Sequence, residues 1–255
     1  MRKRRACIFT FVQNENVFLK IWLNYYSRFF IPQDIYVVDH ETTDGSIQEC
    51  ARDYQFKIIN VQNPYWDAAW KTRVCRRIQS YLLKSHQYVI YTDADEFLAP
   101  APERYKDLSQ FVNSYKGLCA RAAGYNIVQK CDVEPRIDMA RPILGQRAHW
   151  AFSISYCKTL LGRIPLEWSP GFHHIPNESP PHHQGDLFLL HLHRLDFDLC
   201  WEKHARVAKE CRFNPHDCRG LSWQYRISDQ DTFRRKFFSP CDEKIVRRTM
   251  FDGLL

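Results

Sequence analysis

The first hundred residues alternate between short apolar runs and amphipathic segments. Four runs rich in apolar, β-branched and aromatic residues have the composition of buried strands: 7–12, 35–38, 56–61 and 88–93. Three segments between them carry apolar residues at helical spacing: 18–29, 47–54 and 66–84. Asn14 is expected to be the N-cap of the first helix. The resulting β-α-β-α-β-α-β order predicts a parallel sheet with helices on both faces.

The pattern becomes less regular after residue 100. It predicts a short helix, one or two strands, a loop, a further strand and a final helix, in that order: 108–115, 118–128, 135–145, 152–161 and 196–211. No internal repeat interrupts this order. We therefore expect an α/β fold whose regular first half is followed by an irregular region and C-terminal helices.

The fourth predicted strand ends in two carboxylates one residue apart, Asp93 and Asp95. If the chain stays extended, both side chains point the same way, about 6 to 7 Å apart at roughly 3.3 Å per residue. The small Ala94 between them leaves room for a bulky anion, and two carboxylates can hold a hard divalent cation. The alternative is a solvated acidic loop, which is the commoner meaning of an isolated Asp-x-Asp.

Ligands of open parallel sheets bind beyond the carboxyl ends of the strands, where Asp39 also lies. No glycine precedes Gly45, so the chain has neither a dinucleotide fingerprint nor a phosphate loop at its first strand. A nucleotide bound here must therefore be held by carboxylates, a metal ion and cationic side chains.

Composition and charge limit the possible partners and location of the protein. The chain has 255 residues, 45% of them hydrophobic, which is enough for a substantial core, and its net charge is +7. The basic residues are interspersed, which disfavours nucleic acid and leaves a phosphorylated substrate or an anionic surface. The basic run Arg2, Lys3, Arg4 and Arg5 suggests either peripheral contact with the inner face of a membrane or a solvated tail. Without a spanning segment or a signal peptide, we expect a cytoplasmic protein.

Four stretches in order resemble one enzyme family: FVQNENVFLKIWLNYYSRF at 11–29, IYVVDHETTDGS at 35–46, YTDADEFL at 91–98, and GFHH with LLHLHR at 171–174 and 189–194. They are similar to family 2 glycosyltransferases, which have the GT-A fold. The resemblance implies a single GT-A domain over 1–255, with a Rossmann-like, mostly parallel sheet flanked by helices. Its parts would be a nucleotide-sugar-binding half, an acceptor and catalytic half, and a helical extension: 1–98, 99–195 and 196–255.

The implied activity is metal-dependent transfer of a sugar, with inversion, from a UDP- or GDP-linked donor to a hydroxyl of a glycan or lipid-linked acceptor, as in polysaccharide biosynthesis. By the resemblance, Asp39 would contact the base or ribose. Asp93 and Asp95, with Ala94 between them, would serve the ribose and a Mn²⁺ or Mg²⁺ ion bridging the diphosphate. His191 or His193 would add a metal ligand.

The resemblance implies a cationic residue near the diphosphate, for which Arg73 is the first choice and Lys71 the second. The chain departs from the family at 40–42, where relatives carry Asn and Ser. The resemblance therefore leaves open how the nucleobase would be recognised.

Inversion needs one base to deprotonate the acceptor hydroxyl. Glu167 is the first choice, with Asp186 and Glu178 as alternatives, although for any one of them a solvated surface carboxylate is the commoner case. Six of the eleven histidines fall between residues 173 and 193. Function is favoured for His173, as a substrate contact, and for His191, and a polar loop for His182 and His183.

Aromatic side chains in the irregular half could stack on an acceptor sugar. Trp150 and Trp168 are the candidates, and core packing is the competing interpretation.

Two other functions remain open. A nucleotidyltransferase, or another Mg²⁺-dependent phosphoryl-transfer enzyme, would also need an Asp pair, but would be expected to carry a glycine-rich loop at the first strand. A binding module that has lost the chemistry would be indicated if Asp95 or His191 pointed away from the cavity.

Overall fold

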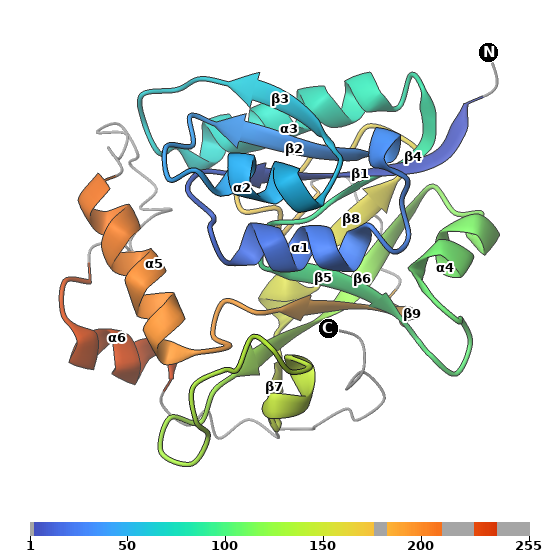
Figure 1. Ribbon diagram of the computed structural model, residues 1–255. Coiled ribbons are helices and arrows are strands. Elements are labelled where there is room, and N and C mark those ends of the chain that lie inside the picture. The colour runs from blue at the N-terminus through green and yellow to red at the C-terminus, as the bar shows by residue number, and fades with distance from the viewer. Residues whose placement is uncertain (1–2, 176–182, 211–226, 239–255) are drawn as a thin grey trace.

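The computed structural model describes residues 3–175, 183–210 and 227–238 (Figure 1). The first half contains the predicted seven elements in order: β1 (Arg4–Val12), α1 (Phe18–Tyr26), β2 (Ile35–His40), α2 (Ser46–Asp53), β3 (Lys57–Val61), α3 (Ala68–Leu82) and β4 (His86–Tyr91). The remaining strands and helices are β5 (Glu96–Pro100), α4 (Leu108–Ser114), β6 (Cys119–Val128), β7 (His149–Phe152), β8 (Thr159–Gly162), β9 (His183–His191), α5 (Phe197–Glu210) and α6 (Gln230–Phe237). Short 3-10 turns are η1 (Pro32–Asp34), η2 (Leu144–Gln146) and η3 (Ile154–Tyr156).

One sheet joins the strands in the order β3-β2-β1-β4-β8-β6-β9-β5, with β7 paired to β6. The pairings β3-β2, β2-β1 and β1-β4 are parallel, whereas β8 runs antiparallel to both β4 and β6. Figure 1 shows α1 and α2 on one face of the parallel strands and α3 on the other. The strand order reverses direction between β3 and β4, and right-handed crossovers place the helices on opposite faces at such a reversal. The predicted α/β class with a Rossmann-like sheet flanked by helices is confirmed.

Helix α1 fastens the segment that follows β4. Two buried aromatic side chains of α1 form hydrogen bonds with this segment. Nε1 of Trp22 donates to Oγ1 of Thr92 at 2.8 Å, and the hydroxyl of Tyr26 donates to the carbonyl of Glu96 at 3.2 Å. The Tyr26 ring also stacks on Phe97, with ring centroids 6.1 Å apart. Asp93 and Asp95 lie between Thr92 and Glu96 in the sequence, so these contacts with α1 fix the chain on both sides of the two carboxylates.

The predicted N-cap of α1 is wrong. The helix begins after Val17, which makes no side-chain cap bond, while Asn14 has a φ of 56° three residues earlier. The Asn14 carboxamide oxygen instead accepts from the backbone N–H of Thr43 at 2.8 Å and of Asp44 at 3.2 Å. Asn14 thus ties the loop after β1 to the loop after β2, because both loops lie at the same edge of the sheet.

The predicted strand over 152–161 is interrupted. It divides into β7 and β8, and η3 between them folds back over β6, where the Ser153 N–H donates to the Gly124 carbonyl at 2.9 Å. A Cβ at Gly124 would overlap the backbone of Tyr156, so this close approach needs glycine. The segment 118–128 is a single strand, β6.

The basic N-terminus is part of the fold from Lys3 onward; Arg2 lies outside the described residues. Arg4 begins β1 and forms an ion pair with Asp34 at 2.6 Å. The Arg5 guanidinium donates to the carbonyl of Val112 at 2.6 Å, and Lys3 donates to a carbonyl at the end of α3. The expected solvated tail is therefore wrong for Lys3, Arg4 and Arg5. Across the described ranges, no helix has both the length and the apolar character needed to cross a bilayer.

Candidate functional site

A cavity of about 320 Å³ lies at the carboxyl ends of β1, β2 and β4. Its wall is assembled from the ends of the parallel strands, the start of α3, the turn after β4, the loop at 171–173, the end of β9 and one residue of α5. This is the edge at which ligands bind in open α/β sheets, and the volume is that of a small-molecule site. Asp93, Ala94 and Asp95 all line it.

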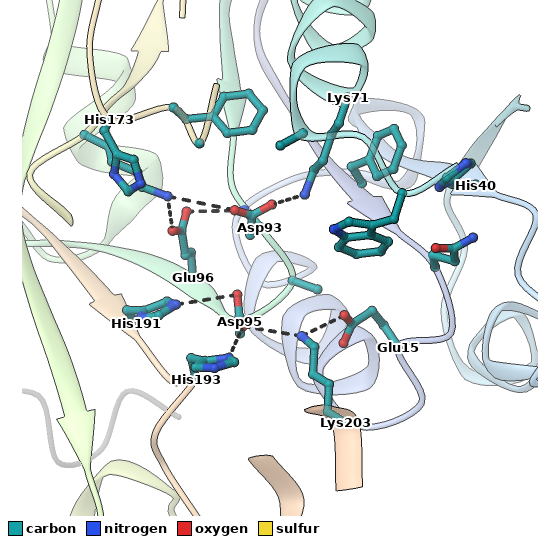
Figure 2. Close-up of a pocket in the computed structure, with 18 of the residues that line it drawn as sticks. Glu15, His40, Lys71, Asp93, Asp95, Glu96, His173, His191, His193 and Lys203 are labelled. Carbon is teal, nitrogen blue, oxygen red and sulfur yellow. Dashed lines mark hydrogen bonds and ion pairs between the residues drawn. The ribbon is translucent and has the colours of Figure 1, made fainter. Parts of the chain in front are cut away.

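The two aspartates do not lie on one extended strand as predicted. Strand β4 ends at Tyr91 and β5 begins at Glu96, and the Glu96 N–H donates to the Asp93 carbonyl at 3.0 Å, closing a turn. Because alternation is lost in a turn, the two carboxylates face different parts of the cavity. Figure 2 shows Asp93 directed toward Lys71 and Asp95 toward the two histidines.

Asp93 is surrounded by cations. Nζ of Lys71 lies 2.7 Å from its Oδ1, the Tyr91 hydroxyl donates to the same oxygen at 2.6 Å, and Nζ of Lys158 lies 3.9 Å from Oδ2. Burial acts to raise the pKa of Asp93, but Lys71 and Lys158 outweigh it and lower the pKa to about 2. Lys71, the second choice from the sequence, is therefore at the cavity beside Asp93.

Directly behind Asp93 is a buried ion pair that sequence reasoning missed. Nζ of Lys158 lies 2.5 Å from Oε1 of Glu96, and both residues line the inner wall with almost no exposure. Burial alone would lower the pKa of Lys158, but Glu96 and Asp93 raise it, so the lysine is charged. Glu96 directly follows the Asp-x-Asp, which is a local signal, but nothing in the sequence pairs it with a lysine 62 positions away.

Asp95 is in different surroundings. Its carboxylate oxygens lie 4.0 Å from Nε2 of His191, 3.6 Å from Nδ1 of His193 and 3.5 Å from Nζ of Lys203, which also pairs with Glu15 at 2.7 Å. Burial acts to raise the pKa of Asp95, yet Lys203 and the two imidazoles hold it well below its usual range. Both histidines from LLHLHR thus lie at Asp95, and Asp95 and His191 both face the cavity. The orientation that would have indicated a binding module without chemistry is absent.

The protonation of His191 follows from its second contact. Its Nδ1 lies 2.7 Å from Oδ1 of Asn126, an atom that only accepts, so the proton is on Nδ1 and the lone pair is on Nε2. Burial lowers the pKa of His191 well below its usual range, which keeps the ring neutral. A neutral imidazole whose other N–H is bound to an oxygen is the form in which histidine binds metal ions.

The donors around Asp95 suit a divalent metal ion. At metal–ligand bonds of about 2.1 Å, two ligands of one ion lie roughly 3 to 4 Å apart, which matches the separations from Asp95 to His191 and His193. The lone pair on Nε2 of His191 also faces a carboxylate oxygen of Asp95, and a cation between the two atoms would relieve their repulsion. Within the described ranges, no group of three or more His, Cys, Asp or Glu side chains is arranged so that it could hold a metal ion. Lys203 instead contacts the carboxylate.

The opposite end of the cavity is aromatic. The His40 ring lies 5.0 Å from that of Trp70 and 5.5 Å from that of Phe11. These planar side chains can stack on a nucleobase. Asp39 was expected to contact the nucleobase or ribose, but its carboxylate accepts from the Thr42 N–H at 2.9 Å. The following residue, His40, lines the cavity.

Three other predicted residues lie away from the cavity. Glu167 is exposed and pairs with Arg76 at 2.9 Å in a surface hollow that also contains Arg73. Asp186 pairs with Arg104 at 2.5 Å near the opposite end of β9 from His191. The structure therefore does not bring Glu167, Asp186 or Arg73 to this cavity. Glu178 and His182 lie outside the described residues, as does the side chain of His183.

The two tryptophans proposed for acceptor contact are core residues. Trp150 and Trp168 have no exposed surface, and their indole N–H groups donate to the carbonyls of Arg147 at 3.2 Å and Thr159 at 2.8 Å. Their polar atoms are satisfied internally, so these side chains pack in the core as the competing interpretation expected. His173 does line the cavity.

No protein-family model and no curated protein matches the sequence. Among solved structures, glucosyl-3-phosphoglycerate synthase from Mycobacterium tuberculosis, solved with Mn²⁺, UDP and glucosyl-3-phosphoglycerate, is similar over 66% of this chain and 61% of its own, with 16% identity and a TM-score of 0.38. This chain thus spans less than two thirds of that neighbour's length. Mouse xyloside xylosyltransferase 1 has 13% identity over 51% of this chain and 53% of its own, with a TM-score of 0.23. The 4-diphosphocytidyl-2C-methyl-D-erythritolsynthase of Anaerococcus prevotii has 14% identity over 98% and 95%, with a TM-score of 0.31.

Proposed function

We propose that this chain is a metal-dependent glycosyltransferase. It would transfer a sugar from a nucleotide-sugar donor, with inversion, to a hydroxyl of a glycan or lipid-linked acceptor. The observation that carries the proposal is the composition of one cavity at the carboxyl edge of the parallel strands. An aromatic end suited to a nucleobase is followed by lysines suited to a diphosphate and by a carboxylate with two imidazoles suited to a metal ion.

The leaving group in this reaction is a nucleoside diphosphate, which gains negative charge as the sugar departs. Lys71 and Lys158, fixed at Asp93, would stabilise that charge. Asp95, His191 and His193 would hold the metal ion, which supplies Lewis-acid stabilisation of the diphosphate. Two nitrogen donors favour Mn²⁺ over Mg²⁺, which prefers oxygen ligands and retains its waters.

A thermal-shift panel tests this function. UDP-, GDP-, CDP- and dTDP-sugars and the corresponding nucleoside triphosphates are each added with Mn²⁺, with Mg²⁺ and with EDTA. A ligand at about 100 times its dissociation constant stabilises the folded state by roughly 2.7 kcal/mol, so a matching donor gives a clear shift that EDTA reverses.

Two variants show whether the shift comes from this cavity. Asp95→Asn should lose the metal-dependent part of the shift, while Asp186→Asn, which lies at the far end of β9, should keep it. A panel in which no nucleotide sugar gives a metal-dependent shift would falsify the function. A larger shift with nucleoside triphosphates than with any nucleotide sugar would indicate a nucleotidyltransferase instead.

A further inference from the structure

His173 lies at the end of the cavity opposite His40, with Asp93 between them (Figure 2). If the nucleobase occupies the aromatic end and the diphosphate lies over Asp93, His173 is on the side from which an acceptor must approach. The proposed function leaves this side without a base, because Glu167 and Asp186 lie elsewhere.

The backbone that carries His173 is a tight turn. Gly171 and Phe172 both have positive φ, 82° and 63°, and the Phe172 N–H donates to the Ser169 carbonyl at 2.9 Å. A phenylalanine in this conformation is strained and persists only where packing determines it. Here Phe172 is buried against Tyr91, with ring centroids 4.3 Å apart. The strain is therefore stored directly beside His173.

The ring of His173 is held in one tautomer. Its Nδ1 lies 2.5 Å from the carbonyl oxygen of Ser155, so Nδ1 donates and the lone pair is on Nε2. Ser155 belongs to η3, the turn fastened over Gly124. A Cβ on Gly171 would lie 2.9 Å from Nε2, so a side chain at position 171 would obstruct this nitrogen. A backbone carbonyl that orients an imidazole in this way prepares its other nitrogen to accept a proton.

The carboxylates that line the described part of the cavity are less suited to this role. Each is already engaged by an N–H donor or a lysine: Glu15 and Asp95 with Lys203, Asp67 with the Trp70 N–H, Asp93 with Lys71, and Glu96 with Lys158. Protonating such a carboxylate breaks an ion pair or a helix cap. Burial raises the pKa of Glu96 to about 7, against the effect of Lys158, but this carboxylate is only 1% exposed and stays paired with the lysine.

We propose that His173 is the general base of the glycosyl transfer, an assignment that rests on the proposed function. Nε2 takes the proton of the acceptor hydroxyl as that oxygen forms a bond to the anomeric carbon. The bond from the anomeric carbon to the diphosphate oxygen breaks, and its electron pair leaves with the nucleoside diphosphate. The group must be neutral at the start, and burial, reinforced by Lys158, lowers the pKa of His173. His174 acts in the same direction, and Asp93 and the Ser155 carbonyl oppose it; the Tyr156 ring packs against the imidazole.

The test uses water as the acceptor. Release of UDP from UDP-glucose and of GDP from GDP-mannose is measured with Mn²⁺ for the wild type, His173→Ala and His173→Gln. Loss of a general base is worth about 10²- to 10⁴-fold, so both variants should release nucleotide at least 100-fold more slowly. They should bind nucleotide as the wild type does and lose the acid limb of the pH–rate profile, and added imidazole should partly restore His173→Ala. The matched control is His174→Ala, an exposed neighbour, which should keep the rate.

A measurement without substrate checks the geometry. The ¹⁵N spectrum of the wild-type ring should show the proton on Nδ1, and a proton on Nε2 overturns the assignment. Wild-type release rates in His173→Ala, or a loss explained by weaker nucleotide binding, overturn it too. A wild type that binds no nucleotide sugar overturns the proposed function and the base with it, whereas normal release by His173→Ala removes the base alone.

Discussion

Asp93 and Asp95 are separated by one residue, yet they belong to two different halves of the cavity. The lysine half consists of Asp93, Lys71, Lys158 and Glu96, and every cation in it carries a permanent charge at neutral pH. The imidazole half consists of Asp95, His191 and His193, with Lys203 reaching in from α5. In the first half the carboxylate is neutralised by ammonium groups; in the second it faces imidazole nitrogens, one of which is a neutral acceptor.

The difference suggests a division of labour in the proposed reaction. Ammonium groups can stabilise phosphate charge directly and need no metal ion. A neutral imidazole beside a carboxylate offers lone pairs, which attract a metal ion and repel a phosphate. A turn that separates the carboxylates thus allows one Asp-x-Asp to serve two kinds of electrostatic contact.

A substitution of Lys158 in the lysine half should have the largest effect, which is a loss of folding stability. Lys158→Met removes the one cation that forms an ion pair with Glu96 among the described residues and leaves a carboxylate that is 1% exposed. Removing one member of a buried ion pair typically costs about 3 to 5 kcal/mol. Urea unfolding should show that loss in the free energy of unfolding.

Two variants separate charge burial from lost packing. The double variant Lys158→Met with Glu96→Gln should recover much of the stability, because no buried charge is then uncompensated. Lys71→Met should cost less than Lys158→Met, since its partner Asp93 is 25% exposed and water can replace the lysine. Equal losses at Lys71 and Lys158 would show that burial of the Glu96 pair is not the cause.

The imidazole half is tested through a residue that would not touch the ion. Asn126→Ala removes the oxygen that fixes the tautomer of His191. Loss of such an orienting partner typically weakens metal binding about 10- to 100-fold, and calorimetric titration with Mn²⁺ measures it. Asn113→Ala, at an exposed position of α4, is the matched control. Unchanged Mn²⁺ affinity in Asn126→Ala would exclude His191 as a ligand and remove the distinction between the halves.

The first half of the fold could be predicted because its signals are local. Each strand and helix from β1 to β4 is a contiguous segment with its own periodicity, and the structure contains all seven in order. The second half depends on contacts between distant segments. The fold-back of 153–156 over Gly124 divides an apolar run that reads as one strand, and Trp150 and Trp168 are buried by pairings that no local pattern displays.

For the candidate site, the sequence predicted several of the residues but not their directions or their distant partners. Residue types suggested Asp93, Asp95, His191, His193 and Lys71, and all of them line the cavity. Their directions were not predictable, because a turn at 93–96 replaces the expected strand. Lys158 was not predictable either, since its role depends on an antiparallel pairing of β8 beside β4. The position of Glu167 shortly before the histidine-rich region likewise favoured this residue, which an arginine on α3 holds at the surface.

The smallest expected effect concerns acid stability, which should fall in two separate pH windows. His191 has a pKa below its usual 6.5 in the folded protein, so below pH 6.5 the unfolded chain binds more protons and stability declines as pH falls. Asp93 has its pKa lowered from 3.8 to about 2, so its contribution is complete above pH 3.8 and is lost as pH falls toward 2. Measured with EDTA by urea unfolding across pH, His191→Gln should reduce the loss of stability only in the upper window and Asp93→Asn only in the lower. If either variant flattened both windows, protonation of one half would alter the other, and the two carboxylates would act as a single coupled site.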